Sequence, residues 1–354
     1  MRGVREVELT IADIAFGGKG VARDHGKVVF VPYTIEGERV AARITREKKQ
    51  FAEAETTAIL EPAAQRVPPR CPYFGHCGGC SYQHIGYGHQ LEIKTRQVEQ
   101  TLRRIGQLSD IPMRPILPSP LPYEYRNRIT VHVDEHAIGF FARDSHELID
   151  ITHCPISRPE VNRQLTELRR RRPHHGHYTL RAEDGPRIFS QTNDRVADAL
   201  SDLVANFLQG GGEVLIDAYC GAGFFTKRLS PFFTSTVGID WDIFAIEAAQ
   251  RSSTGCETYI AGDVATELAT MLQSVDRTRT SVVVDPPATG LTTETRQILA
   301  QFAPANLVYI SCSPPTLARD LGELRSTFQI ESVTPLDMFP QTAEIEVAVY
   351  LRAR

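Results

Sequence analysis

A cysteine at the end of an expected strand is the first candidate for chemistry. Residues 307–310 form an apolar, β-rich run, and residues 311–315 form the turn that ends it. Cys312 is therefore expected at the carboxyl end of a strand, where open α/β sheets place their chemistry. A thiol fixed there is a nucleophile if its thiolate is favoured, whereas a cysteine without such a setting is usually a small buried hydrophobe.

A second group of cysteines has the composition of a metal site. Cys71, Cys77 and Cys80 follow a proline-rich linker in C-x5-C-x2-C spacing, in a loop rich in glycine. Such a loop can wrap three thiolates around one soft metal centre, and Cys154 is the candidate for a fourth ligand. Four thiolates suit either a [4Fe-4S] cluster or zinc, and the spacing alone leaves both open.

Acidic residues end several expected strands in the C-terminal part. A strand over residues 213–218 leads into a Tyr-Cys-Gly-Ala-Gly turn, and Asp240, Asp263 and Asp285 follow at later strand ends. This order predicts a doubly wound nucleotide fold. The turn lacks the third glycine of the dinucleotide fingerprint, which disfavours NAD. The turn would instead let the backbone approach a small ligand, with Asp240 accepting from ribose hydroxyls.

Three domains are expected to position these groups. Residues 1–61 alternate in short runs between glycine turns, which predicts a small antiparallel barrel. Residues 62–185 contain an amphipathic helix over 90–105 and a hairpin, which together predict a central α+β domain. We expect this helix to pack on the catalytic domain. Residues 186–354 alternate strands and helices, as in an α/β domain.

Charge and composition favour a polyanionic partner. The net charge is +1 over residues 1–60, +3 over 61–185 and −8 over 186–354. Tyr125, Arg126 and Arg128 mix aromatic and basic character, which is typical of a nucleic-acid face. The barrel offers further candidates for phosphate contact or base stacking: Lys27, Arg43, Arg46, Lys48, Lys49, Phe30, Tyr33 and Phe51. No apolar run is long enough to span a membrane, and seven cysteines without a leader favour the cytoplasm.

The motifs together resemble one family. The patterns beginning at Gly18, Lys27 and Gly37 resemble a TRAM domain, an OB-like RNA-binding module. This barrel, C-x5-C-x2-C with a distant cysteine, D-x-Y-C-G-x-G, D-P-P, S-C-x-P and a terminal acidic motif occur in one order. The set is similar to the iron–sulfur-containing RNA (uracil-C5)-methyltransferases, which make 5-methyluridine, and the resemblance covers essentially the full chain.

The resemblance implies a multidomain protein in which a TRAM β-barrel precedes an iron–sulfur α+β domain and a Rossmann-like methyltransferase domain. It implies a [4Fe-4S] cluster on Cys71, Cys77, Cys80 and Cys154. It implies S-adenosylmethionine binding by Gln191, Tyr219, Asp240, Asp263 and Asp285. It makes Cys312 the nucleophile and Glu346 the proton-abstracting base. The implied substrate is RNA, with 23S ribosomal RNA favoured over transfer RNA, and we expect a monomer.

The chemistry explains these residue types. Uracil C5 is too weak a nucleophile to take a methyl group from a sulfonium. Attack of the Cys312 thiolate on C6 gives an enolate whose C5 can displace the methyl group, after which a base removes the C5 proton and the thiol is eliminated. No histidine follows His177, so an acid is the natural base here; Glu344 is a rival to Glu346 on the same expected strand face. The target base would be flipped into the pocket.

Several residues depart from the family pattern. They are Phe224, Ala288, Ser313, Gln341 and Glu344. These departures make it necessary to compare two other functions with RNA uracil-C5 methylation. An amino-group methyltransferase needs an aromatic after Asp-Pro-Pro, where Ala288 stands, and has no use for Cys312. A non-catalytic RNA-binding homologue is opposed by the retention of Asp285, Cys312 and Glu346 together.

Overall fold

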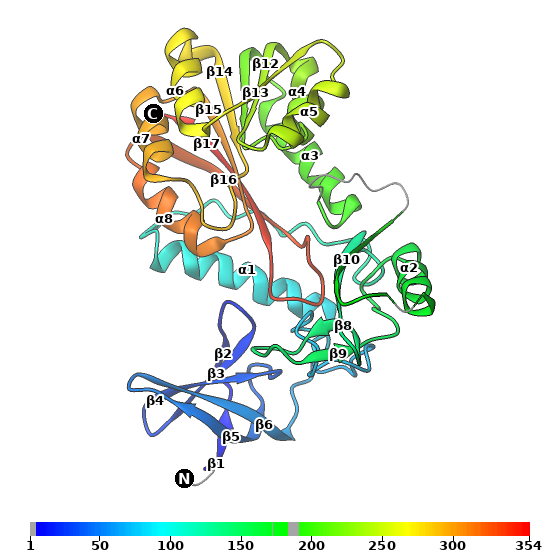
Figure 1. Cartoon of the computed structure of the whole chain (residues 1–354). Coiled ribbons are helices and arrows are strands. Elements are labelled where there is room, and N and C mark those ends of the chain that lie inside the picture. Colours follow the sequence, from blue (N-terminus) through cyan, green and yellow to red (C-terminus); the bar gives the residue numbers. More distant parts are fainter. Residues whose placement is uncertain (1–4, 172, 183–190) are drawn as a thin grey trace. The chain divides into compact units, whose positions relative to one another are not determined.

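The computed structural model describes residues 5–171, 173–182 and 191–354. The chain forms two compact units, shown with their elements in Figure 1. Unit 1 comprises Met1–Gln97, Leu121–Gly185 and Phe339–Glu344, and unit 2 comprises Val98–Pro120, Pro186–Met338 and Ile345–Arg354. The expected boundary between residues 185 and 186 lies outside the described residues.

Unit 1 begins with a six-stranded half-barrel. Its strands are β1 (Glu6–Thr10), β2 (Asp13–Ile14), β3 (Lys19–Asp24), β4 (Lys27–Pro32), β5 (Arg39–Glu47) and β6 (Phe51–Glu61). They pair in the order β1-β5-β6-β4-β3-β2. The alternation of the sequence buries Leu9, Val29, Val31 and Val40 on one face. The all-antiparallel prediction is wrong for one pair, because the first residues of β6 run parallel to β4 while the whole of β6 pairs antiparallel with β5.

A second sheet of unit 1 follows. Its strands are β7 (Arg128–Val133), β8 (Ile138–Phe141), β9 (Leu148–Asp150) and β10 (Gly176–Arg181), paired antiparallel in the order β10-β7-β8-β9. Helix α2 (Pro159–Arg170) buries Val161 and Leu165 in the same core as Ile129 and Val131. The outward residues of the strands are therefore left for other contacts.

Helix α1 (Tyr87–Arg104) begins three residues before the predicted helix, and the division between the units falls within it. Its residues up to Gln97 belong to unit 1. Val98 and Leu102 are fully buried in the core of unit 2, as amphipathic spacing predicts.

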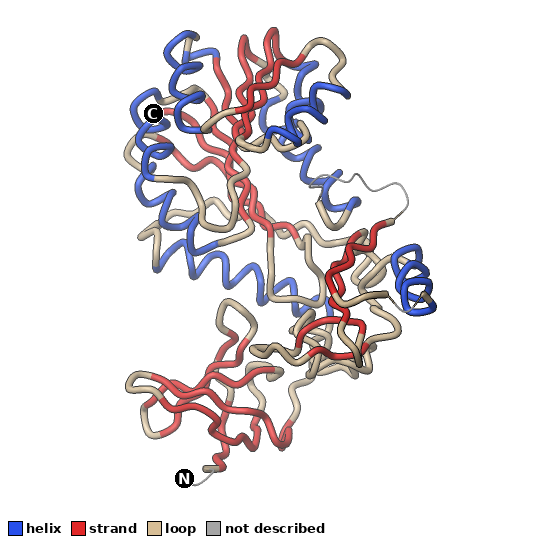
Figure 2. The backbone as a smooth tube through the Cα atoms, in the orientation of Figure 1, coloured by secondary structure: helices blue, strands red, loops and turns tan. Residues whose placement is uncertain are grey.

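Unit 2 is a mixed sheet flanked by helices (Figure 2). Its elements are α3 (Asp194–Leu208), β11 (Gly212–Ala218), α4 (Phe224–Leu229), η1 (Ser230–Phe232), β12 (Phe233–Asp240), α5 (Ile243–Arg251), β13 (Glu257–Ala261), α6 (Val264–Ser274), η2 (Arg277–Arg279), β14 (Thr280–Val284), α7 (Thr293–Phe302), β15 (Asn306–Ser311), α8 (Pro314–Leu324), β16 (Phe328–Leu336) and β17 (Glu346–Ala353).

The strand order of unit 2 determines where a ligand can bind. The order is β13-β12-β11-β14-β15-β17-β16, parallel except for β17, which runs antiparallel to both neighbours. Helical crossovers run to one side of β11 and then to the other, so the switch point lies between β11 and β14. A crevice is expected at the carboxyl ends of these two strands. The parallel strands with helices between them confirm the predicted α/β character of this part of the chain.

Candidate functional site

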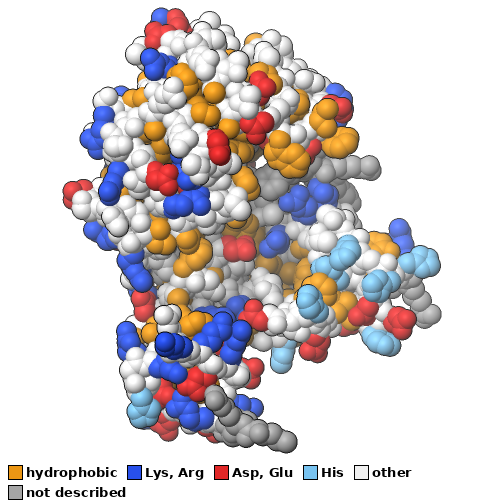
Figure 3. All heavy atoms as spheres, turned by 60° about the vertical axis from the view of Figure 1, so that its left-hand side comes forward, with side chains coloured by type: hydrophobic (Ala, Val, Ile, Leu, Met, Phe, Trp, Pro, Cys, Tyr) orange, Lys and Arg blue, Asp and Glu red, His pale blue; other side chains and the backbone are white. Residues whose placement is uncertain are grey.

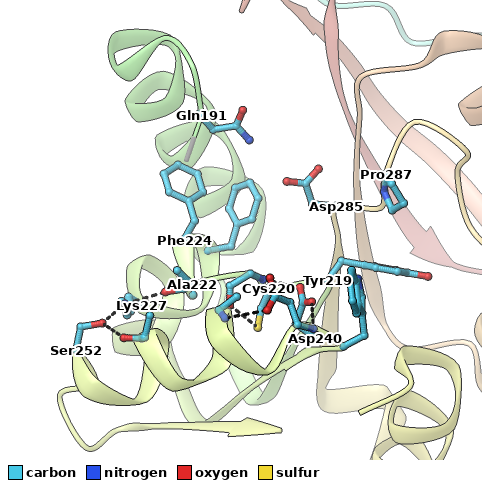
Figure 4. Close-up of a pocket in the computed structure, with 17 residues that line it drawn as sticks. Gln191, Tyr219, Cys220, Ala222, Phe224, Lys227, Asp240, Ser252, Asp285 and Pro287 are labelled. Carbon is cyan, nitrogen blue, oxygen red and sulfur yellow. Dashed lines mark hydrogen bonds between the residues drawn. The ribbon is translucent and has the colours of Figure 1, made fainter. Parts of the chain in front are cut away.

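A glycine turn after β11 shapes one wall of a cavity of about 690 Å³ in unit 2 (Figure 4). Tyr219, Gly221 and Gly223 all have positive φ, at 67°, 52° and 81°. A side chain at Gly223 would place its Cβ 2.5 Å from the hydroxyl of Tyr259, so this position requires glycine. The Gly221 N–H donates to Asp240 Oδ2 at 2.8 Å, which ties the turn to the end of β12.

Four of the five residues predicted to bind the methyl donor line this cavity. They are Gln191, Tyr219, Asp240 and Asp285 (Figure 4). The fifth, Asp263, is not among the described lining residues; its carboxylate accepts from the N–H and hydroxyl of Thr266 and caps α6. The structure therefore shows that Asp263 caps helix α6, a role that its position at a strand end in the sequence did not indicate.

Two carboxyl groups at the ends of neighbouring strands are strongly perturbed. Burial raises the pKa of Asp217 to about 7, although Thr226 donates to it through both its N–H and its hydroxyl. Burial, followed by the charge of Asp217, raises the pKa of Asp285 to about 7. Of the two, Asp285 lines the cavity, and a cation bound there would favour its ionised form.

Aromatic side chains that sequence analysis did not assign also line the cavity. Trp241 directly follows Asp240 and is 76% exposed. Phe224 is 39% exposed and packs edge-on against Phe225 with ring centroids 4.8 Å apart. The sequence contained a signal for Trp241, because this residue directly follows Asp240, an acid at the end of an expected strand. A flat ring bound in the cavity could cover such surfaces.

The expected nucleophile and base lie at the ends of adjacent strands. Cys312 directly follows β15 and is exposed, and Glu346 is the first residue of β17, with only 3% of its surface exposed. In the ladder Ser311 and Val347 form the last pair, so Cys312 and Glu346 are the residues directly beyond it, and continuing the register would place them opposite one another. Directly opposite residues in an antiparallel pair have Cβ atoms about 5 Å apart, which suits two groups acting on one base.

The rival base lies in a different setting. Glu344 is exposed and precedes β17, so the prediction that it shares a strand face with Glu346 is wrong. The strand begins two residues later than expected, and the N–H of Glu344 donates instead to the hydroxyl of Thr342.

The turn that carries Cys312 is fixed to the loop that carries Asp285. The N–H of Ser313 donates to the Ser311 hydroxyl at 3.1 Å, and the hydroxyl of Thr316 donates to the carbonyls of Ala288 and Ser313. Ala288, one of the departures from the family pattern, forms this link through its backbone carbonyl.

The four predicted metal ligands, Cys71, Cys77, Cys80 and Cys154, all belong to unit 1. Burial raises the pKa of Cys71, Cys77 and Cys80, and each of these thiols is further affected by the charge of Cys154. For Cys80 the pKa reaches about 12. Thiolates at these positions would repel one another, and a positively charged centre would relieve that repulsion.

Backbone contacts hold these cysteines in place. Asn162 on α2 accepts from the N–H of Cys154 at 2.9 Å and donates to its carbonyl at 3.0 Å. The side chain of Gln83 accepts from the N–H of Cys71, and the N–H of Gly79 donates to the sulfur of Cys77 at 3.4 Å. In the described part of the chain, no group of three or more His, Cys, Asp or Glu side chains is arranged so that it could hold a metal ion.

Several residues expected to contact RNA are engaged within unit 1. Tyr125 is buried and its hydroxyl donates to the Pro340 carbonyl, so its prediction as part of a nucleic-acid face is wrong. The ring of Tyr33 contacts Phe74, and its hydroxyl accepts from Arg143. Other barrel residues expected to contact RNA have partners within the barrel. Lys27 pairs with Glu47, Arg43 with Glu6 and Arg46 with Glu53, while Lys48 lies over Phe51 and Phe30 packs edge-on against Phe51.

Two family models match the chain. Residues 3–57 match the TRAM domain, and residues 268–354 match the tRNA (Uracil-5-)-methyltransferase family. Among relatives, an uncharacterized RNA methyltransferase of Bdellovibrio bacteriovorus is 32% identical over 377 residues, covering 98% of this chain and 95% of that protein. One from Protochlamydia amoebophila is 30% identical over 425 residues, covering 98% of each.

A solved structure shows the same fold over almost the whole chain. It is the tRNA (uracil-54, C5)-methyltransferase of Pyrococcus abyssi in complex with S-adenosyl-L-homocysteine, with a TM-score of 0.76 and 23% identity. The match covers 97% of this chain and 99% of that one. No helix in the described part of the chain is both long and apolar enough to cross a membrane. With its TRAM domain and methyltransferase sheet, the chain belongs to the S-adenosylmethionine-dependent RNA (uracil-C5)-methyltransferase family.

Proposed function

We propose that the protein methylates C5 of a uridine in RNA through a covalent bond between Cys312 and C6 of the base. The observation that supports this most directly is the strand register: Ser311 and Val347 are the last pair of β15 and β17, and Cys312 and Glu346 are the next residues beyond it. They lie at the edge of the sheet that also holds the carboxyl ends of β11 and β14. A nucleophile and a carboxylate on adjacent, hydrogen-bonded strands keep their spacing without help from a flexible loop.

Each residue has a defined task in this scheme. The Cys312 thiolate attacks C6 and later leaves, and Glu346 takes the proton from C5 between these steps. The low exposure of Glu346 keeps bulk water away from the carboxylate that must receive this proton. The methyl donor supplies an electrophilic methyl group when bound.

The donor site is proposed to consist of the cavity residues. Asp240 uses one oxygen for the Gly221 N–H and the other for the Asp242 N–H, and its remaining lone pairs can accept from ribose hydroxyls. Asp285 would face the positive charge of the donor, and Gln191 lines the cavity as well. Asp263 would act indirectly, through its cap on α6.

A [4Fe-4S] cluster is proposed on Cys71, Cys77, Cys80 and Cys154. The donor set fits by its chemistry, since all four candidates are thiols and the sulfur of Cys77 already accepts a backbone N–H. The cluster would link the loop after the linker to the start of α2, and its role would be structural because the transfer scheme contains no redox step.

The proposed substrate is large-subunit ribosomal RNA, with transfer RNA as the alternative. Total RNA containing 5-fluorouridine offers both, and a fluorine at C5 cannot leave as a proton. With S-adenosylmethionine, we expect a denaturation-resistant protein–RNA adduct, and sequencing the attached RNA identifies the target.

Matched variants make this experiment decisive. Cys312→Ala should give no adduct, whereas Cys256→Ala, which removes another exposed cysteine of unit 2, should behave like the wild type. With ordinary uridine, Glu346→Gln should accumulate the methylated adduct that the wild type resolves. An adduct that persists in Cys312→Ala, or none at all while donor binding is intact, would refute the covalent mechanism.

A further inference from the structure

A second cavity of unit 2 shares no described lining residue with the cavity that follows β11. Its volume is about 520 Å³, which is within the range of sites that hold small ligands. It is lined from the segment after α1, from α3, and from β16 and β17. The lining residues that bear on its chemistry are Arg114, Phe207, Glu331, Ser332, Thr334 and Tyr350.

An irregularity in β16 brings a carboxylate into this cavity. In the ladder with β17, Ile330 pairs with Leu351. The next pair is Ser332 with Tyr350, so Glu331 is an extra residue on β16. Consecutive residues of a regular strand point to opposite faces of the sheet, yet Glu331 and Ser332 line the same cavity. A bulge re-aims a side chain in this way, and bulges are frequent beside functional sites.

Two stacked aromatic rings form another wall of the cavity. The ring of Phe207 on α3 lies almost parallel to that of Tyr350, with centroids 5.2 Å apart and planes inclined by 9°. Both residues are half-buried. The hydroxyl of Tyr350 donates to Asn306 Oδ1 at 2.7 Å, which holds this ring in place. A flat ring bound in the cavity can extend the stack.

The remaining polar groups belong to β16 and to the segment beside it. The hydroxyls of Ser332 and Thr334 lie 3.3 Å apart, and both residues are buried. Two hydroxyls joined by one hydrogen bond keep a second O–H that can donate to a ligand. Arg114 is exposed, and its N–H donates to the Val333 carbonyl at 2.8 Å, which fixes the arginine beside the same strand.

The base-pairing edge of guanine matches this set of groups. It presents two neighbouring donors, N1–H and N2–H, beside the acceptor O6, whereas adenine, cytosine and uracil each present a single donor group there. The Glu331 carboxylate can accept from both donors, and the hydroxyl pair can donate to O6. A guanidinium such as that of Arg114 suits a phosphate.

We propose that this cavity binds a guanosine phosphate unit of the RNA substrate, with the base stacked on the Phe207–Tyr350 pair and recognised by Glu331, and with a phosphate at Arg114. This inference rests on RNA being the substrate, and it adds a specificity-determining site to the proposed reaction. A free guanine nucleotide offers the same chemical groups, so the experiment below separates the two sources.

The position of the cavity favours RNA as the source. Glu346, the proposed base, and Tyr350 are four residues apart on β17, so they share a face of the sheet about 13 Å apart along the strand. A few nucleotides of unpaired RNA span such a distance.

Charge alone does not select RNA in this part of the chain. Residues 186–354 contain 12 Lys and Arg against 20 Asp and Glu. Figure 3 also shows basic and acidic side chains interspersed on the face that it presents. Phosphate contacts position a nucleic acid, whereas base contacts specify its sequence, so a cavity that recognises one base supplies what charge does not.

The first test is calorimetry of the full chain with GMP, IMP and AMP, with S-adenosylhomocysteine present to fill the donor site. IMP lacks only the N2 amino group of GMP. The wild type should therefore bind GMP about tenfold more tightly than IMP, because a hydrogen bond to a charged acceptor is lost. Glu331→Gln should remove most of this preference. Glu294→Gln, at an exposed position of α7, is the matched control and should keep it.

Two further variants test the other contacts. Arg114→Gln should weaken the binding of GMP but not that of guanosine, which has no phosphate. Phe207→Leu removes the ring and should weaken GMP and IMP by the same factor, about tenfold, since stacking does not depend on the N2 group. Unchanged GMP affinity in Phe207→Leu would overturn the stacking role. Thermal unfolding of each variant separates a lost contact from a misfolded domain.

The source of the guanosine is tested with fluorescein-labelled oligouridylate that carries one guanosine or one inosine. The guanosine form should bind more tightly to the wild type, and Glu331→Gln should remove the difference. Selectivity for GMP without any difference between the two oligonucleotides would overturn RNA as the source and support a free guanine nucleotide. Equal binding of GMP, IMP and AMP, or a preference for GMP that survives in Glu331→Gln, would overturn the site.

The covalent adduct with RNA containing 5-fluorouridine is scored separately. Absence of the adduct with guanosine selectivity intact would count against the proposed reaction alone. An adduct that forms while guanosine and inosine bind equally would count against this site alone.

Discussion

Replacing Asp320 by alanine should destabilise unit 2 by about 3–5 kcal/mol, because it breaks a buried ion pair and leaves its cation behind. Asp320 lies in α8, the helix that begins just after Cys312, and its side chain is fully buried. Its carboxylate pairs with Arg296 at 3.2 Å and accepts from the Tyr309 hydroxyl at 2.6 Å. It also accepts from the N–H of Leu291, which ends the loop after Asp285.

The magnitude follows from what remains after the substitution. Arg296 is only 9% exposed at its side chain, so its charge cannot be fully hydrated once Asp320 is removed. Arg296 keeps its contact with Glu323 at 2.6 Å, which places the expected loss toward the lower end of the range. Asp320→Asn should cost less, since the amide oxygen can still accept hydrogen bonds.

Urea unfolding followed by the fluorescence of Trp241 is the assay, because the chain has a single tryptophan and it lies in unit 2. Glu323→Ala is the control: it removes the exposed partner of the same arginine and should cost under about 1 kcal/mol. Turnover should fall with Asp320→Ala even at urea concentrations well below the unfolding midpoint, because the substitution removes the carboxylate that links α8 to the loop after β14. A loss of stability no larger than that of Glu323→Ala would refute this reasoning.

Three further predictions concern the ligands. Trp241→Leu should raise the Kd for S-adenosylhomocysteine about tenfold in calorimetry, whereas an unchanged Kd would exclude stacking on this ring. Because the pKa values of Asp217 and Asp285 are raised from 3.8 to about 7, the unfolding free energy of the free protein should fall as pH rises from about 4 to 7. Affinity for the cationic donor should rise over pH 6 to 8 as Asp285, which lines the cavity, ionises, and an affinity that does not change with pH would contradict this link. Cys77→Ser should lose iron and lower the Tm of unit 1, while Cys256→Ala should do neither.

Much of the site could be predicted because its chemistry is set by strand ends. Periodicity located β11, β12, β14 and β15, and parallel strands carry their carboxyl ends to one edge of the sheet. Tyr219, Asp240 and Asp285 therefore meet at the cavity without any knowledge of the side-chain packing. Asp263 shows the limit of this reasoning, because a strand-end acid can cap the next helix instead.

The pairing of His132 with His177 across β7 and β10 could not be predicted in this way. His132 and His177 are separated in the chain by β8, β9 and α2, and only the register of β10 on β7 pairs them. A shift of that register by one residue would turn these side chains to the other face. Register depends on packing across the whole sheet core, and that information is absent from the local pattern of either strand.

The departure at Gln341 also acquires a physical meaning only from the structure. Gln341 is buried, and its amide oxygen accepts from Gln90 while its N–H donates back to the Gln90 oxygen. Its own side-chain NH₂ donates to the carbonyl of Pro122, and its main-chain carbonyl accepts from Ser81 and Tyr82. A residue whose donor and acceptor are both used inside unit 1 serves packing rather than proton transfer. The replacement at 341 therefore alters how the segment before β17 is held, and it is compatible with Glu346, at the start of that strand, as the proposed base.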